Sequence, residues 1–136
     1  MNYLINILPY LTSINNNKNM YDISYSKNQR LKYANDMLEK HPNRVPIIVK
    51  FYDNIKYHLN NPYFMCKKNI TISEFLLIIR KRLKINKNVA IFLFLDNNIL
   101  PSISNRIEEI YNKHHDPDTN DLVVYITLEN CFGSLM

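Results

Sequence analysis

The spacing of hydrophobic residues predicts three helices in this chain. Each carries apolar residues at intervals of three, four or seven, with polar residues between them, which places the apolar residues on one helical face. These faces are Leu31, Ala34, Met37 and Leu38 in residues 25–41, Ile72, Phe75, Leu76, Ile79 and Leu83 in residues 71–85, and Ile107, Ile110 and Tyr111 in residues 106–115. Pro42 ends the first helix, while Thr71 and Glu74 form a predicted capping box at the start of the second.

Four further segments show the patterns of β-strands. Residues 44–52 alternate with a period of two, and their Pro46 indicates a sheet edge or a strand start, because proline has no N–H to donate. Residues 62–66 predict a short second strand after a turn rich in Asn and His. Residues 89–95 are apolar without alternation, which predicts a central strand covered on both faces. Residues 121–129 are another strongly β-forming segment.

The order of elements after the first helix is therefore β-β-α-β-α-β. A hairpin, a crossover helix, a buried strand and a final strand predict an α+β fold with a mixed four-stranded sheet and the crossover helix on one face. This is the ubiquitin-like β-grasp arrangement, here preceded by an N-terminal helical segment. We expect residues 21–133 to form this domain and residues 1–20 to be an appendage, set apart by the polar run NNNKN at 15–19.

Length and composition agree with one domain in a reducing compartment, either the cytosol or the nucleus. The 136 residues are 46% hydrophobic, which is enough for a core. Cys66 and Cys131 have neither the number nor the spacing of a disulfide framework or a zinc site, which suits a reducing compartment. No apolar run approaches the ~18 residues of a membrane span. The opening residues lack a basic region and a small-residue cleavage site, so we expect no signal peptide.

Gly133 is the only glycine of the chain and lies in the closing residues ENCFGSLM. Elsewhere, pairs such as Asn60-Asn61 and Asn97-Asn98 stand where turns are predicted, since asparagine is the next residue to tolerate left-handed backbone. Position alone leaves two explanations for Gly133. It belongs to a loose terminal turn, or to a site where the backbone passes through a narrow enzyme channel that tolerates no Cβ.

Five segments resemble one protein family in order and spacing: HPNRVPIIV, IIRKRLKI, AIFLFLDNNILP, EIYNKHHD and ENCFG. It is the family of ubiquitin-like autophagy modifiers, of the gamma-aminobutyric-acid-receptor-associated protein and microtubule-associated light chain type. The resemblance covers residues 28–133. It implies that a processing cysteine protease cuts after Gly133, and that activating and conjugating enzymes carry the protein as a thioester. An amide bond to phosphatidylethanolamine is then the final product.

This resemblance assigns a role to the end of the chain. Phe132 and Gly133 are the implied cleavage and conjugation residues, and residues 134–136 are the tail that proteolysis removes. The implied location is cytoplasmic, with membrane association on autophagosomes, vesicles or organelles once the protein is lipidated.

The resemblance also implies a binding site for receptor peptides with an acidic aromatic-x-x-aliphatic motif. The peptide is expected to add as a strand beside residues 45–51. The implied aromatic pocket is lined by Met37, Pro46, Ile48 and Met65. The implied aliphatic pocket is lined by Phe64, Cys66, Ile70, Phe75 and Ile78, and the cations that meet the acidic residues are Arg44 and Arg82. Phe75 and Ile78 have a second explanation, because apolar helix residues usually lie in the core.

Other classes of function have weaker support. The cationic run RKRLK at 80–84 suits nucleic-acid phosphates, but no stacking aromatics lie between the cations, so we expect no nucleic-acid partner. His114-His115 lacks partners at ligand spacing, and we expect no metal or cofactor. No triad order, nucleophile elbow or glycine-rich loop is present, so we expect no enzyme. The remaining alternative is a non-lipidated ubiquitin-like adaptor for peptides or the cytoskeleton, which would not require Phe132-Gly133.

Overall fold

The computed structural model of this chain describes residues 26–51, 59 and 61–128. The elements, in chain order, are α2 (Lys27–Lys40), β1 (Arg44–Phe51), β2 (Tyr63–Lys67), α3 (Ile72–Leu83), β3 (Ile91–Phe94), the short 3-10 helix η2 (Asp96–Asn98), α4 (Ile107–His114) and β4 (Leu122–Leu128). This order confirms the prediction. None of these described helices is long and apolar enough to cross a membrane. The predicted appendage, Phe132, Gly133 and the predicted tail lie outside the described residues.

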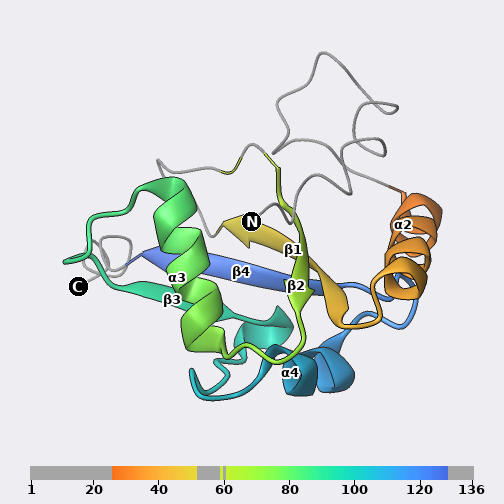
Figure 1. The fold of residues 1–136 in the computed structure, drawn as a ribbon. Helices are drawn as coiled ribbons and strands as arrows, with labels where there is room; N and C mark the ends of the chain where they lie inside the picture. The colour runs from red at the N-terminus through yellow and green to blue at the C-terminus, as the bar shows by residue number, and fades with distance from the viewer. Residues whose placement is uncertain (1–25, 52–58, 60, 129–136) are drawn as a thin grey trace, which may run out of the picture.

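The strands form one mixed sheet in the order β2-β1-β4-β3 (Figure 1). β1 pairs antiparallel with β2 and parallel with β4, and β4 pairs antiparallel with β3. The predicted mixed four-stranded sheet is therefore confirmed.

β1 is a central strand, so an edge position for residues 44–52 is wrong. Proline is typical of sheet edges because it leaves a neighbouring strand without an N–H donor. Here the parallel ladder between β1 and β4 begins after Pro46, with the register pair Ile47 and Leu122. The ladder therefore needs no N–H from Pro46, and Pro46 instead marks the start of the β1–β4 pairing.

β3 lies at an edge of the sheet, so the prediction of a central strand at residues 89–95 is also wrong. Leu93 and Leu95 are buried, whereas Phe92 and Phe94 on the alternate positions are only half-buried. An unbroken apolar run shows that both faces of a strand are apolar, but it does not indicate how many strands pair with it. The two central places belong to β1 and to β4, which pairs with β1 and β3.

α3 lies across one face of the sheet (Figure 1), and its predicted apolar face is confirmed. All five predicted residues are buried and share the main core with residues of α4 and with alternate residues of β1 and β2. The predicted capping box is also present. Glu74 N–H donates to Thr71 Oγ1 at 3.2 Å, and Thr71 N–H donates to Glu74 Oε1 at 3.1 Å. The side chains of Thr71 and Glu74 therefore accept hydrogen bonds from N–H groups at the start of α3, and this fixes where the helix begins.

α2 covers the opposite face of the sheet. Tyr33 and Met37 of α2 pack with Ile48 of β1 and with Tyr63 and Met65 of β2 in a second buried cluster. These strand residues alternate with those of the main core, so they point to the other face. The sheet consequently has helices on both faces, with β2 between the two clusters.

Asparagine supplies left-handed backbone in two of the described turns. Asn98 has a φ of 60° and Asn120 a φ of 57°, and the third described residue with positive φ is Lys84, at 54°. Asn98 confirms the prediction that asparagine takes a position usually filled by glycine in the turn at 97–98.

Candidate functional site

β2 has an open edge in the described part of the sheet, because it stands last in the strand order and pairs with β1 alone. Val49 N–H donates to Pro62 O at 2.8 Å, which makes these two a hydrogen-bonded pair of the antiparallel ladder. Such pairs alternate with pairs that turn their backbone groups outward. Tyr63, Met65 and Lys67 therefore direct their N–H and C=O groups away from β1. These groups are the ones that an added strand can bind.

The open edge moves the predicted docking site from residues 45–51 to β2. β1 has strands on both sides and cannot accept another. Two side chains already contact the edge of β2. Asn61 Oδ1 accepts a hydrogen bond from Tyr63 N–H at 3.0 Å, and Arg44 Nη1 donates one to Met65 O at 3.1 Å. Side chains in such positions protect a sheet edge against unwanted strand pairing.

The residues implied for the aromatic pocket lie together on the α2 side of β2. They are Met37, Pro46, Ile48 and Met65, and all four are buried. Tyr33 of α2 and Tyr63 of β2 fill the space beside them. Their rings meet edge to face, with centroids 5.6 Å apart. The rings of Tyr33 and Tyr63 thus occupy the place where the aromatic side chain of a peptide is expected to bind.

The residues implied for the aliphatic pocket lie on the α3 side of β2. Phe64, Cys66 and Phe75 are at most 2% exposed and belong to the main core, where the rings of Phe64 and Phe75 pack edge to face. Phe75 therefore occupies the core, as its second explanation predicts. Ile70 and Ile78 are half-buried and pack against the core from outside. These two residues present the accessible apolar surface on this side.

Cys66 is a packing residue and not a reactive thiol. Burial raises the pKa of the thiol to about 12, although the positive charge of Arg44 acts in the opposite direction. The thiolate is the reactive form of cysteine, and at neutral pH this thiol stays protonated. Cys66 therefore contributes to the site as a small apolar side chain.

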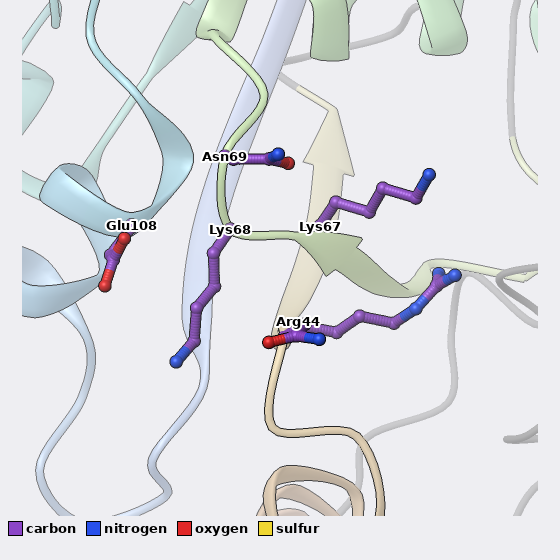
Figure 2. Close-up of a pocket in the computed structure, with 6 residues that line it drawn as sticks. Arg44, Lys67, Lys68, Asn69 and Glu108 are labelled. Atoms are coloured by element: carbon purple, nitrogen blue, oxygen red, sulfur yellow. The ribbon is translucent and has the colours of Figure 1, made fainter.

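The two arginines expected to meet acidic residues lie on different sides of β2. Arg82 comes from α3, and its guanidinium carbon lies 5.6 Å from the centroid of the Phe64 ring. Arg44 belongs to β1 and lines a pocket of about 630 Å³ at the end of β2. The other lining residues are Asn43, Lys67, Lys68, Asn69 and Glu108. Figure 2 shows Arg44 and Lys67 extending to one side of this pocket and Lys68 to the other, where Glu108 lies.

One residue of the cationic helix end, Arg80, and one of the histidine pair, His115, have structural roles. Arg80 Nη1 donates to the carbonyl oxygens of Asn86 at 2.9 Å and Val89 at 2.8 Å, which closes the turn between α3 and β3. The His115 ring stacks on Tyr111, with centroids 4.8 Å apart. Within the described ranges, no three side chains of His, Cys, Asp or Glu gather as potential metal ligands.

Sequence reasoning missed Tyr33 and Asn61. Tyr33 stands one helical turn before Met37, so the helical period was a usable signal for it. Asn61 stands two residues before Tyr63, the spacing at which an asparagine side chain binds the local backbone.

The strand order and the crossing helix define the class of protein as a ubiquitin-like β-grasp fold. The family described as "Autophagy protein Atg8 ubiquitin like" matches residues 29–133. Autophagy-related protein 8 of Schizosaccharomyces pombe is 32% identical over 117 residues, which cover 84% of this chain and 92% of that protein. An autophagy-related protein 8-like protein of Dictyostelium discoideum is 34% identical over 114 residues, covering 81% and 90%.

A solved structure agrees with these relatives. The crystal structure of Trypanosoma brucei ATG8 matches this chain with a TM-score of 0.73 and 26% sequence identity, covering 82% of this chain and 96% of that one. This chain belongs to the Atg8 family of ubiquitin-like autophagy proteins.

Proposed function

We propose that this protein is a ubiquitin-like modifier that is cleaved after Gly133, joined through Gly133 to phosphatidylethanolamine, and used there to recruit receptor peptides. The observation that carries the proposal is that the family match ends at residue 133, and Gly133 is the only glycine of the chain. Every turn in the described ranges forms without glycine. The presence of glycine at position 133 therefore requires a chemical reason.

The proposed reactions supply that reason. A cysteine protease hydrolyses the bond between Gly133 and Ser134, which releases residues 134–136 and leaves a carboxylate on Gly133. Activating and conjugating enzymes then carry the acyl group as a thioester. The amine of phosphatidylethanolamine attacks the thioester, forms an amide and releases the enzyme's thiol. Each nucleophile must reach the same carbonyl carbon, and glycine is the least hindered acyl group for this purpose.

The lipid provides a membrane anchor, and none of the described helices is long and apolar enough to cross a membrane. Each buried methylene group contributes about 0.8 kcal/mol to membrane binding, and a single acyl chain anchors a protein only marginally. Phosphatidylethanolamine brings two chains, so its amide holds the protein on an autophagosomal or related membrane. In this cycle the protein is the substrate of the enzymes and performs no catalysis itself.

The position of β2 between two apolar clusters supports peptide docking at its edge. In an extended strand, residues separated by an odd number of positions point to opposite faces. The anchors of an aromatic-x-x-aliphatic peptide are three residues apart, so a strand added to β2 turns one anchor toward α2 and the other toward α3. The aromatic anchor enters beside Met37 and Met65 when the Tyr33 and Tyr63 rings move apart. The aliphatic anchor lies on Ile70 and Ile78.

The decisive experiment compares four chains in cells that contain the conjugation enzymes. They are the full-length protein, its Gly133→Ala variant, a chain that ends at Gly133 and a chain that ends at Phe132. Membrane fractions and intact masses are measured before and after treatment with phospholipase D. We expect a lipid adduct on the full-length protein and on the chain that ends at Gly133. The chain that ends at Phe132 stays unmodified.

The Gly133→Ala variant gives the sharpest comparison. Its added methyl group lies next to the reacting carbonyl, where a misplacement of about 1 Å can lower a rate roughly 100-fold. We expect little or no adduct on this variant, with an unchanged melting temperature. Lipidation as efficient as that of the parent protein would remove the main support for the modifier. A non-lipidated ubiquitin-like adaptor would then be the better account.

A further inference from the structure

The residues that follow the last described strand contain the same sequence pattern as the proposed receptor peptides. Phe132 is aromatic and Leu135 is aliphatic, and Gly133 and Ser134 separate them. In an extended strand, residues three positions apart point to opposite faces. A strand of this sequence added to β2 would therefore turn Phe132 toward α2 and Leu135 toward α3, where the two apolar clusters lie.

The pattern occurs four more times in the chain, and each of these occurrences is held within the domain. Residues 75–78 belong to α3, residues 92–95 begin in β3, and residues 125–128 belong to β4. Residues 52–55 lie between β1 and β2 and are therefore tied to the domain at both ends. Residues 132–135 instead follow β4, the last described strand, so this occurrence is the one that can extend to another molecule.

The register of the sheet shows how far this segment would have to extend. A strand added outside β2 lies three strand spacings from β4, because β1 and β2 stand between them, and this distance is about 14 Å. Ile126 of β4 lies opposite Phe51, and Met65 of β2 lies opposite Pro46. Leu128 therefore stands seven positions beyond Met65 along the strand direction, which is roughly 23 Å.

Phe132 cannot cover this distance within its own molecule. The two displacements combine to roughly 27 Å between the end of β4 and the aromatic pocket beside Met65. Phe132 follows Leu128 by four residues, and a fully extended chain of four residues spans at most about 14 Å. The docking site that Phe132 can reach is therefore that of a second molecule.

We propose that residues 132–135 of one uncleaved molecule dock on β2 of a second uncleaved molecule. Phe132 is the aromatic anchor and Leu135 is the aliphatic anchor, in the pockets proposed for receptor peptides. This inference rests on the proposed docking site and on the proposed cleavage after Gly133, and it adds a partner, a second copy of this chain. Uncleaved molecules thereby occupy one another's docking sites and compete with receptor peptides.

Cleavage after Gly133 ends this contact because it separates the two anchors. Hydrolysis adds a hydroxyl group to the carbonyl carbon of Gly133 and a hydrogen to the nitrogen of Ser134, so Leu135 leaves with the released peptide. Burial of a leucine side chain changes a binding constant about tenfold or more, so the aromatic anchor alone binds weakly. The reaction that produces the Gly133 carboxylate for conjugation therefore also frees docking sites for receptors.

Sedimentation velocity over a range of protein concentrations tests the self-association. The proteins are the uncleaved chain, a chain that ends at Gly133, and the Leu135→Ala and Met136→Ala variants of the uncleaved chain. Reducing conditions prevent a disulfide between Cys131 residues. We expect the uncleaved chain and Met136→Ala to associate as the concentration rises, and the other two proteins to remain single molecules. Met136→Ala is the matched control, because it also removes a large apolar side chain from the tail.

Calorimetry then measures the contact directly. A peptide of residues 129–136 is added to the chain that ends at Gly133, and a receptor-type aromatic-x-x-aliphatic peptide is added for comparison. We expect Leu135→Ala to weaken the binding of the tail peptide about tenfold or more. Ile78→Ala in the protein should weaken the binding of both peptides. The receptor-type peptide should also convert associated uncleaved chains to single molecules, because it takes the same site.

Other outcomes contradict the inference, and they separate it from the proposed docking site. If the receptor-type peptide binds and the uncleaved chain remains a single molecule at every concentration, the inference is wrong and the docking site stands. Association that persists in Leu135→Ala, or that the receptor-type peptide does not disrupt, places the contact on another surface and overturns the inference. If neither peptide binds to the folded protein, the docking site is wrong and the inference is wrong with it.

Discussion

Arg30 of α2 donates two hydrogen bonds to Asp121, the residue just before β4, from Nε to Oδ2 at 3.0 Å and from Nη2 to Oδ1 at 2.7 Å. The Asp121 side chain is 1% exposed, and Thr119 Oγ1 donates a further hydrogen bond to Oδ1 at 2.7 Å. The hydrogen bond to Asp121 raises the pKa of Arg30. This pair holds α2 against the sheet and so fixes one wall of the proposed aromatic pocket.

Replacing Asp121 with asparagine should therefore destabilise the fold. The variant keeps the size of the side chain and leaves the partly buried Arg30 without its counter-charge, and removing one partner of a buried pair typically costs about 3 kcal/mol or more. We expect a loss of about 3 kcal/mol in the free energy of unfolding, measured by urea denaturation at neutral pH.

A second ion pair provides the control, because it joins the same two segments at the surface. Lys27 Nζ lies 3.2 Å from Asp118 Oδ2, and both side chains are about two-thirds exposed, at 69% and 66%. Lys27→Met should change the free energy of unfolding by less than about 1 kcal/mol. Equal effects of Lys27→Met and Asp121→Asn would show that burial of the Arg30–Asp121 pair does not anchor α2.

Local sequence predicted the helices well, because their signals lie within a few residues. The capping box of Thr71 and Glu74 and the apolar face of α3 need no information from the rest of the chain. Strand order depends on distant partners instead. Pro46 indicated an edge because sequence alone does not show that the ladder with β4 starts one residue later. The apolar run at 89–95 likewise could not reveal how many strands flank it.

The candidate site shows the same division. The resemblance selected pocket residues that lie together on the two sides of β2, but it did not identify the residues that close the site in this chain. Tyr33 and Tyr63 meet only because α2 packs on β2, and Arg44 reaches Met65 O only because of the hairpin register. Contacts of this kind follow from the packing of whole elements. Sequence spacing within one element does not determine them.

Ile48 illustrates why this matters for mutagenesis. As a groove residue, Ile48 is expected to tolerate truncation with little change in melting temperature, but its side chain is only 5% exposed and belongs to the cluster beneath α2. Deleting its methyl and methylene groups leaves a cavity. We therefore expect Ile48→Ala to lower the free energy of unfolding by about 2–4 kcal/mol, measured by urea denaturation.

Ile78 is the better residue for a test of the groove. It is half-buried on the outer side of α3, so Ile78→Ala should cost less stability than Ile48→Ala while removing apolar surface from the proposed aliphatic pocket. Calorimetry with an aromatic-x-x-aliphatic peptide should show weaker binding to a variant that remains folded. Unchanged affinity for Ile78→Ala would move the aliphatic anchor elsewhere.

Lys84 offers a route to a more stable protein. It ends α3 with left-handed backbone, at a φ of 54° and a ψ of 42°, where a residue with a Cβ is disfavoured by roughly 1 kcal/mol. Lys84→Gly should raise the free energy of unfolding by up to about 1 kcal/mol. Asn98 has a similar φ of 60°, but asparagine tolerates this region, so Asn98→Gly should bring no comparable gain. A melting temperature for Lys84→Gly at or below that of the parent protein contradicts this prediction.

Alkaline pH should weaken the fold in part through Cys66. The pKa of its thiol rises from an ordinary 9.0 to about 12 on burial, so between these values the unfolded chain releases a proton that the folded chain keeps. Folding stability therefore falls as the pH rises through this window, by at most about 1.4 kcal/mol per pH unit for one proton. Burial also raises the pKa values of Tyr33 and Tyr111, which act in the same direction. Cys66→Val removes only the contribution of the thiol. We expect urea denaturation of both proteins between pH 8 and 11, under reducing conditions, to show that the free energy of unfolding declines less steeply with pH in Cys66→Val. Equal slopes for the two proteins would contradict this prediction. They would show that the thiol stays protonated in the unfolded chain or has an ordinary pKa in the fold.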